Sequence, residues 1–172
     1  DVLPSVGLTF NLINGKSYKS KRDSNEVNKV DMKVRTSYNR TVARPNFREI
    51  APYASEDFIR QTTLLGNLDL MPSDINNFDV RWELYPRTNE IVSVSGFYKE
   101  FINPIGLFTN PSAGNAEFQW KNLEYSTVYG GEVELKKRLD FIAKPLKNFT
   151  VAFNYTLVKS ISPIPEVELE KI

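Results

Sequence analysis

The chain has 172 residues, of which 41% are hydrophobic, 12% aromatic and 25% charged, and its 22 basic and 21 acidic side chains leave a net charge of +1. This balance lacks the dense Lys/Arg field that nucleic-acid binding requires, so we expect no nucleic-acid partner. The sequence contains neither Cys nor His, which excludes thiol nucleophiles, disulfides, Cys/His metal sites and His-dependent catalytic triads. We therefore expect no catalytic residues, no metal site and no cofactor.

Hydrophobic residues never form the run of about 18 that a membrane-spanning helix requires. This excludes a helical membrane protein. It does not exclude a transmembrane β-barrel, because its strands alternate lipid-facing and lumen-facing side chains and leave no hydropathy peak.

Six segments alternate apolar and polar side chains with the period of a β-strand, which predicts an all-β fold. Phe97 interrupts the alternation of the fourth segment, and Gly130 and Gly131 lie where a sheet could bend or accept a bulky neighbour. The segments have roughly 10 to 12 residues each, close to the roughly 9 to 11 that cross a bilayer at a tilt. The expected strands are residues 2–13, 32–43, 76–85, 91–102, 126–137 and 148–158.

The connections between these segments alternate in length, as in outer-membrane barrels with short turns on one side and long loops on the other. Residues 14–31 are the exception, because they fall on the short side but carry a charged run that we expect to be a solvated, mobile insertion. The short connections are residues 86–90 and 138–147, and the long ones are residues 44–75 and 103–125.

Short segments that cover nearly the whole chain occur in a specific order. They are Val34–Pro45, Phe47–Pro52, Gly66–Pro72, Asn77–Tyr85, Gly96–Lys99, Pro104 with Ile105, Asn122, Gly130–Glu134 and Asn154–Thr156. This ordered set resembles the C-terminal half of the barrel of TonB-dependent outer-membrane receptors, particularly the type abundant in Bacteroidetes. Two departures are Leu68, where the family usually has Pro, and the charged insertion in residues 14–31.

The resemblance implies a parent protein with a plug domain and an energy-coupling box before a barrel of about 22 strands. Six strands cannot close alone, since the smallest such barrels use about eight. We therefore expect residues 1–160 to be a six-stranded antiparallel, up-and-down segment of a larger transmembrane β-barrel, and residues 161–172 to begin a further, truncated loop.

The function implied by the resemblance is import of a scarce nutrient, such as an iron chelate, a cofactor or an oligosaccharide, across the bacterial outer membrane. The implied partners are the outer-membrane lipid bilayer, the plug domain and remaining barrel of the same parent chain, the TonB system and the small-molecule or oligosaccharide ligand. No bond is made or broken, so an enzyme is not expected.

Charged residues on the polar strand faces are expected to line the barrel lumen: Arg81, Glu83, Glu132 and Glu134. The spacing of Glu132 and Glu134 would also suit an acid/base pair or a hard-cation site. We favour lumen-facing carboxylates paired with a basic residue of a neighbouring strand, such as Arg81 or Lys99.

Aromatic residues among Asn and Gln in the long loops could stack on a ligand, or could pack the loops against one another. These candidate ligand-binding residues are Tyr53, Phe58, Phe108, Phe118, Trp120 and Tyr125.

Two other functions fit parts of the pattern. A soluble β-rich carbohydrate-binding or adhesive module would close the apolar strand faces into the core of a β-sandwich. A carboxylate-based hydrolase would depend on Glu132 and Glu134.

Overall fold

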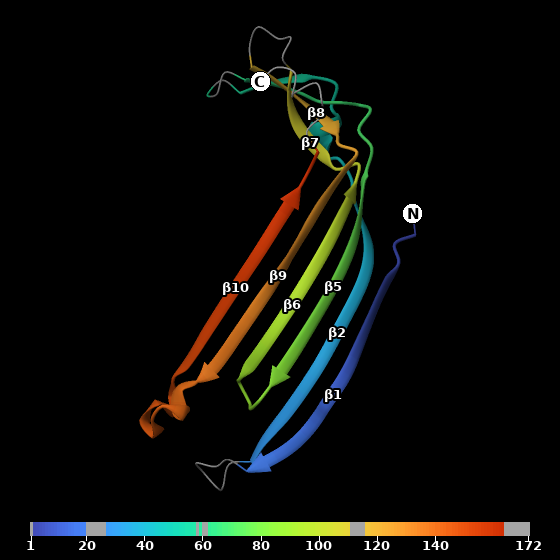
Figure 1. The fold of residues 1–172 in the computed structure, drawn as a ribbon. Helices are drawn as coiled ribbons and strands as arrows, with labels where there is room; N and C mark the ends of the chain where they lie inside the picture. The colour runs from blue at the N-terminus through green and yellow to red at the C-terminus, as the bar shows by residue number, and fades with distance from the viewer. Residues whose placement is uncertain (1, 20–26, 58, 60–61, 111–115, 164–172) are drawn as a thin grey trace.

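The structure is a computed structural model and describes all residues except 1, 20–26, 58, 60–61, 111–115 and 164–172. Its largest part is a six-stranded antiparallel sheet, in which each long strand lies beside the next one along the chain (Figure 1). This up-and-down order confirms the predicted fold class. The strands are β1 (Ser5–Lys19), β2 (Val27–Ala43), β5 (Ser73–Tyr85), β6 (Ile91–Ile102), β9 (Tyr125–Arg138) and β10 (Thr150–Ile161).

The two long connections contain further structure that the periodicity did not predict. They contribute a four-stranded sheet of order β3-β4-β8-β7, which lies at the end of the long sheet opposite the short turns (Figure 1). No helix among the described residues is long and apolar enough to cross a membrane. The additional elements are α1 (Phe47–Ile50), β3 (Ala54–Asp57), β4 (Thr62–Leu65), β7 (Ile105–Asn110), β8 (Ala116–Asn122) and the 3₁₀ helices η1 (Leu139–Phe141) and η2 (Lys144–Asn148).

The first hairpin is longer than expected, and the predicted insertion at residues 14–31 is wrong for most of its length. Strand β1 continues to Lys19 and pairs there with Val27 at the start of β2, across register shifts that follow Asn11 and Ile13. Gly15 permits the irregularity because its φ is +60°. Its backbone N–H donates to Asp31 Oδ1 at 2.6 Å, which ties the two strands together. Residues 20–26 of the charged run lie outside the described residues.

Apolar and aromatic side chains pair across all six strands in continuous rows. One row consists of Phe10, Val34, Trp82, Val94, Val133 and Tyr155, each directly opposite the next. Cross-strand pairs of aromatic and β-branched residues stabilise a sheet. Among the described residues, however, the buried hydrophobic side chains are only Ala51 and Leu70, both outside the long sheet. The long sheet therefore has no core of its own on either face.

Candidate functional site

One face of the six-stranded sheet is apolar and exposed. Phe10, Phe153 and Tyr155 are 52–54% exposed on this face, although they belong to regular, well-paired strands. A contiguous surface of this kind indicates contact with another protein or with a membrane. The β-sandwich alternative does not fit, because the described residues contain no second layer that covers this face.

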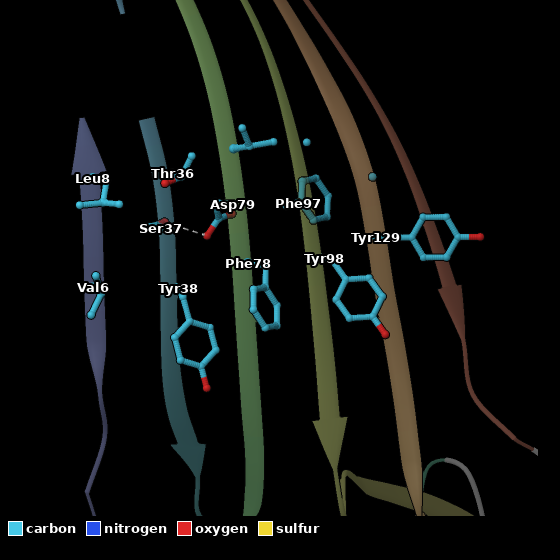
Figure 2. Close-up of a pocket in the computed structure, with 13 residues that line it drawn as sticks. Val6, Leu8, Thr36, Ser37, Tyr38, Phe78, Asp79, Phe97, Tyr98 and Tyr129 are labelled. Atoms are coloured by element: carbon cyan, nitrogen blue, oxygen red, sulfur yellow. Dashed lines mark hydrogen bonds between the residues drawn. The ribbon is translucent and has the colours of Figure 1, made fainter. Parts of the chain in front are cut away.

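A row of aromatic rings marks one border of this apolar face. Tyr38, Phe78, Tyr98 and Tyr129 lie on four adjacent strands in register, and Figure 2 shows their side chains projecting from neighbouring strands. Ring centroids are 4.8 Å apart for Tyr38 and Phe78, and 6.3 Å apart for Phe78 and Tyr98. Aromatic girdles of this kind occur where a transmembrane barrel meets the headgroup region.

Beyond the aromatic row the same face becomes polar. The Tyr38 hydroxyl donates to Asn76 Oδ1 at 3.2 Å, and Asn76 donates in turn to Glu100 Oε2 at 3.2 Å. Arg40 Nη2 forms an ion pair with Asp74 Oδ2 at 2.8 Å. The apolar face is therefore bounded toward the end of the sheet that carries β7 and β8.

The opposite face carries a chain of ion pairs. Arg81 Nε lies 2.8 Å from Glu83 Oε1, and Arg81 Nη2 lies 2.7 Å from Glu134 Oε2. Arg35 Nε lies 3.3 Å from the other carboxylate oxygen of Glu83, whose side chain is only 6% exposed. Ser93 Oγ donates to Glu134 Oε2 at 3.4 Å. The two arginines and the two glutamates balance in charge.

The four charged residues predicted from the sequence share this polar face. Glu134 pairs with Arg81, one of the two candidates, although β6 lies between their strands and the expected neighbouring-strand placement is wrong. Lys99 lies opposite Asn77 and Val128. Glu132 faces Ser95 and Thr156. The ion pair of Glu134 with Arg81 favours the lumen-facing interpretation over an acid/base pair of Glu132 and Glu134. The alternation of its strand also places Arg35 on the polar face, directly opposite Arg81, but Arg35 was not among the predicted lumen residues.

Phe97 is on the polar face as well, and its ring lies over Gly130 of the neighbouring strand. A Cβ added to Gly130 would lie 2.7 Å from Phe97 Cζ and would also collide with the Leu157 carbonyl oxygen. This confirms that a glycine in β9 accepts a bulky neighbour, and it explains why Phe97 interrupts the apolar alternation of β6.

At the short-turn end, a second ion network joins three connections. Arg87 Nη1 lies 2.8 Å from Asp140 Oδ2, and Lys137 Nζ lies 3.5 Å from Glu90 Oε2. The Tyr18 hydroxyl donates to the Pro86 carbonyl oxygen at 3.0 Å. Burial lowers the pKa of Arg87, but the hydrogen bond to Asp140 and the charges of Glu90 and Asp140 raise that pKa by more, to above its usual value. The turns are therefore fixed relative to one another.

The opposite end of the sheet contains a cavity of about 420 Å³ between α1 and the four-stranded sheet. One face of that sheet forms its floor, since β-strand side chains alternate and the lining residues of β4, β7 and β8 lie on the same side. The lining residues are Asn46, Arg48, Glu49, Thr62, Leu64, Leu107, Phe118 and Trp120.

Hydrogen bonds hold the walls of this cavity in place. Asn46 and Glu49 form a capping box at the start of α1, with the Asn46 amide donating to Glu49 Oε1 at 2.7 Å. The Asn67 backbone N–H donates to the Glu49 carbonyl oxygen at 2.7 Å, and its side chain donates to the Trp120 carbonyl oxygen at 3.0 Å. Asn67 therefore links the helix to the floor.

The structure brings together two of the six predicted loop aromatics, Phe118 and Trp120. Phe108 is on the other side of β7 from Leu107, and Tyr53 lies 54% exposed outside the cavity lining. Tyr125 pairs with Ile102 on the long sheet, and Phe58 lies outside the described residues. The aromatic pattern alone missed Leu64, because the pairing of β4 with β8 bridges more than 50 residues of sequence. It also missed Arg48, which belongs to α1 and is not aromatic.

Comparisons with known proteins agree with this architecture. The family model described as TonB dependent receptor-like, beta-barrel matches residues 1–168. The crystal structure of the siderophore receptor PirA from Pseudomonas aeruginosa is similar, with a TM-score of 0.70 and 18% identity over 93% of this chain and 28% of that receptor. No curated protein sequence matches. The chain therefore belongs to the TonB-dependent receptor β-barrel family, whose members are outer-membrane transporters and not enzymes.

Proposed function

We propose that this chain forms part of the barrel wall and extracellular loops of a receptor that imports a scarce nutrient, such as an iron chelate, a cofactor or an oligosaccharide. The chain spans 28% of the length of the siderophore receptor that it matches. Transport is accordingly a property of the complete receptor. The Bacteroidetes-type resemblance stays a prediction.

The observation that carries the proposal is the division of one long sheet into an exposed apolar face and an ion-paired polar face. In a bilayer, lipid would cover the apolar face up to the row of Tyr38, Phe78, Tyr98 and Tyr129. The polar face, with Arg81, Glu83, Glu132 and Glu134, would then line the lumen and contact the plug domain. The flanking strands of the same barrel would pair with the edge strands β1 and β10.

The loop end suits a ligand-binding role. This end of the long sheet is the one away from the tightly linked turns (Figure 1). Here the four-stranded sheet presents Phe118 and Trp120 to a cavity. Ligand sites combine an apolar, aromatic lining with a few polar groups that orient the ligand. With TonB-coupled plug movement, a nutrient bound at this end would enter the lumen past the polar face.

Fractionation of the source cells tests the location. An antibody against this segment should detect a band in the outer-membrane fraction whose apparent mass exceeds that of 172 residues. The electrophoretic mobility of this band should change when the sample is heated in detergent. A soluble band of the segment's own mass that does not shift would contradict the proposal.

Uptake by a gene-disruption strain tests the transport. We expect the strain to lose accumulation of one labelled iron chelate, corrinoid or oligosaccharide, while uptake of glucose stays unchanged as the control. Dissipating the proton motive force in the parent strain should stop accumulation but leave surface binding intact. Unchanged accumulation of every member of such a panel would contradict a role in nutrient import.

A further inference from the structure

We propose that the cavity between α1 and the four-stranded sheet binds a small molecule that carries a carboxylate beside a flat, unsaturated ring. The inference rests on the proposed receptor function and specifies the chemistry of its ligand. The cavity volume of about 420 Å³ is within the range of small-molecule sites, roughly 300–1,000 Å³.

The floor of the cavity provides a stacking surface. Phe118 and Trp120 are alternate residues of β8 and project from the same face of the sheet. Leu107 lies directly opposite Trp120, and Leu64 lies beside Phe118 in the parallel pairing of β4 with β8. Two aromatic rings flanked by aliphatic side chains favour a planar, unsaturated group over a flexible or fully hydroxylated one.

The wall formed by α1 provides the positive charge. Arg48 is exposed, and its contact at 3.5 Å from Nη2 to Ser55 Oγ is a weak hydrogen bond that leaves other guanidinium donors for a ligand. The neighbouring Glu49 keeps its charge, but both of its carboxylate oxygens are engaged by Asn46, whereas Arg48 presents a planar guanidinium whose geometry matches a ligand carboxylate in a bidentate pair.

Other ligand chemistries fit this lining less well. A neutral sugar could use Asn46 and Thr62, but it would leave the Arg48 guanidinium without an anionic partner and would place other hydroxyl groups against Leu64 and Leu107. A free inorganic anion would use Arg48 but leave the aromatic floor without a partner. The combination of Arg48 with Trp120 selects a ligand that has both an anionic and a flat apolar part.

The Asn67 bridge makes this arrangement preformed. One residue donates from its backbone to Glu49 O and from its side chain to Trp120 O, so the cation-bearing helix and the aromatic floor are tied together. A site that is ordered before binding loses less conformational entropy when a ligand enters.

Equilibrium dialysis with the complete receptor in outer-membrane vesicles tests the inference, with fluorescent 2-naphthoate as the probe and 2-naphthamide as its uncharged counterpart. We expect tighter binding of 2-naphthoate. Arg48→Gln should weaken 2-naphthoate about tenfold or more and leave 2-naphthamide unchanged, because only the carboxylate uses the guanidinium. Arg48→Lys should retain part of the preference, and Trp120→Leu should weaken both probes.

Lys121→Gln is the matched control, since Lys121 follows Trp120 on β8 but points to the other face of that sheet. It should change neither probe. Equal binding of the two probes, an Arg48→Gln variant that binds 2-naphthoate normally, or an equal loss in Lys121→Gln would each overturn the inference. If the receptor is found in the outer membrane and accumulates its nutrient but does not bind 2-naphthoate, the inference fails and the proposed function stands. If the protein is absent from the outer membrane, the proposed function itself fails.

Discussion

Glu83 connects two arginines that the strand register places directly opposite each other. Arg35 of β2 and Arg81 of β5 are cross-strand neighbours, an arrangement that is destabilising for like charges. The Glu83 carboxylate lies between them, at 3.3 Å from Arg35 Nε and 2.8 Å from Arg81 Nε. The Glu83 side chain is nearly buried, whereas Arg35 is half exposed, so Glu83 neutralises the two charges from the inner side of the pair and water screens them from the outer side.

Glu83→Gln should therefore destabilise the complete receptor by about 1–2 kcal/mol, a value reduced by the exposure of Arg35. The measurement is the urea midpoint at which the folded, heat-modifiable band is lost. Glu132→Gln removes the same charge from the same face but faces Ser95 and Thr156, so its midpoint should stay close to the parent's. Adding Arg35→Gln to Glu83→Gln should recover part of the loss. An equal loss in Glu132→Gln, or none in Glu83→Gln, would contradict this role.

The face of each charged residue was predictable, but the sequence did not decide between Arg81 and Lys99 as the partner of Glu134. Alternation alone put Arg81, Glu83, Glu132 and Glu134 on one face. The pairing of Arg81 with Glu134, 53 residues apart, depends on the register of β5, β6 and β9 together. A one-residue slip would move a whole strand's side chains to the other face, and the sequence of a single strand does not specify that register.

At the scale of elements, Gly130 and Phe97 fix how β6 and β9 approach each other. The ring of Phe97 lies over the Gly130 backbone, and β10 passes close enough that a Cβ would meet the Leu157 carbonyl oxygen. The packing of three adjacent strands at this level therefore requires a residue without a side chain.

Gly130→Val should sharply reduce the amount of folded receptor, because the branched side chain would collide with backbone as well as with Phe97. The amount of folded receptor is measured as the fraction of heat-modifiable protein in isolated outer membranes. Gly96→Ala is the matched control, since a Cβ there would meet its nearest atoms at an ordinary 3.8 Å. Normal folding of Gly130→Val, or an equal defect in Gly96→Ala, would show that the close approach is not required.

The long strands were predictable as elements because their alternation extends over ten or more residues. The first hairpin was mispredicted because its distal part is mostly polar and lacks the apolar–polar alternation of the other strands. The backbone hydrogen bonds that pair the two strands up to Lys19 do not require an apolar face. The short strands β3, β4, β7 and β8 have only four to seven residues each, and β4 pairs in parallel with the distant β8. Nothing local in the sequence specifies that pairing, so the cavity that it creates was not predictable.

At the scale of the whole molecule, the segment is a single twisted layer with two chemically different faces (Figure 1). Among the described residues, large apolar side chains of β1, β5, β6, β9 and β10 are about half exposed on one face. Ion pairs occupy the other. In the proposed barrel, lipid would contact the apolar face and a polar interior would contact the other, which suits the chemistry of both faces.

The most direct test is site-directed spin labelling of the complete receptor in lipid bilayers, at single cysteines introduced into this Cys-free segment. Val94 lies opposite Val133 on the apolar face, and the adjacent pair of Ser95 and Glu132 lies on the polar face. Labels at positions 94 and 133 should collide mainly with lipid-soluble oxygen, and labels at positions 95 and 132 mainly with a water-soluble nickel complex. Equal access of the nickel complex to all four positions would contradict the assignment of the apolar face to the membrane.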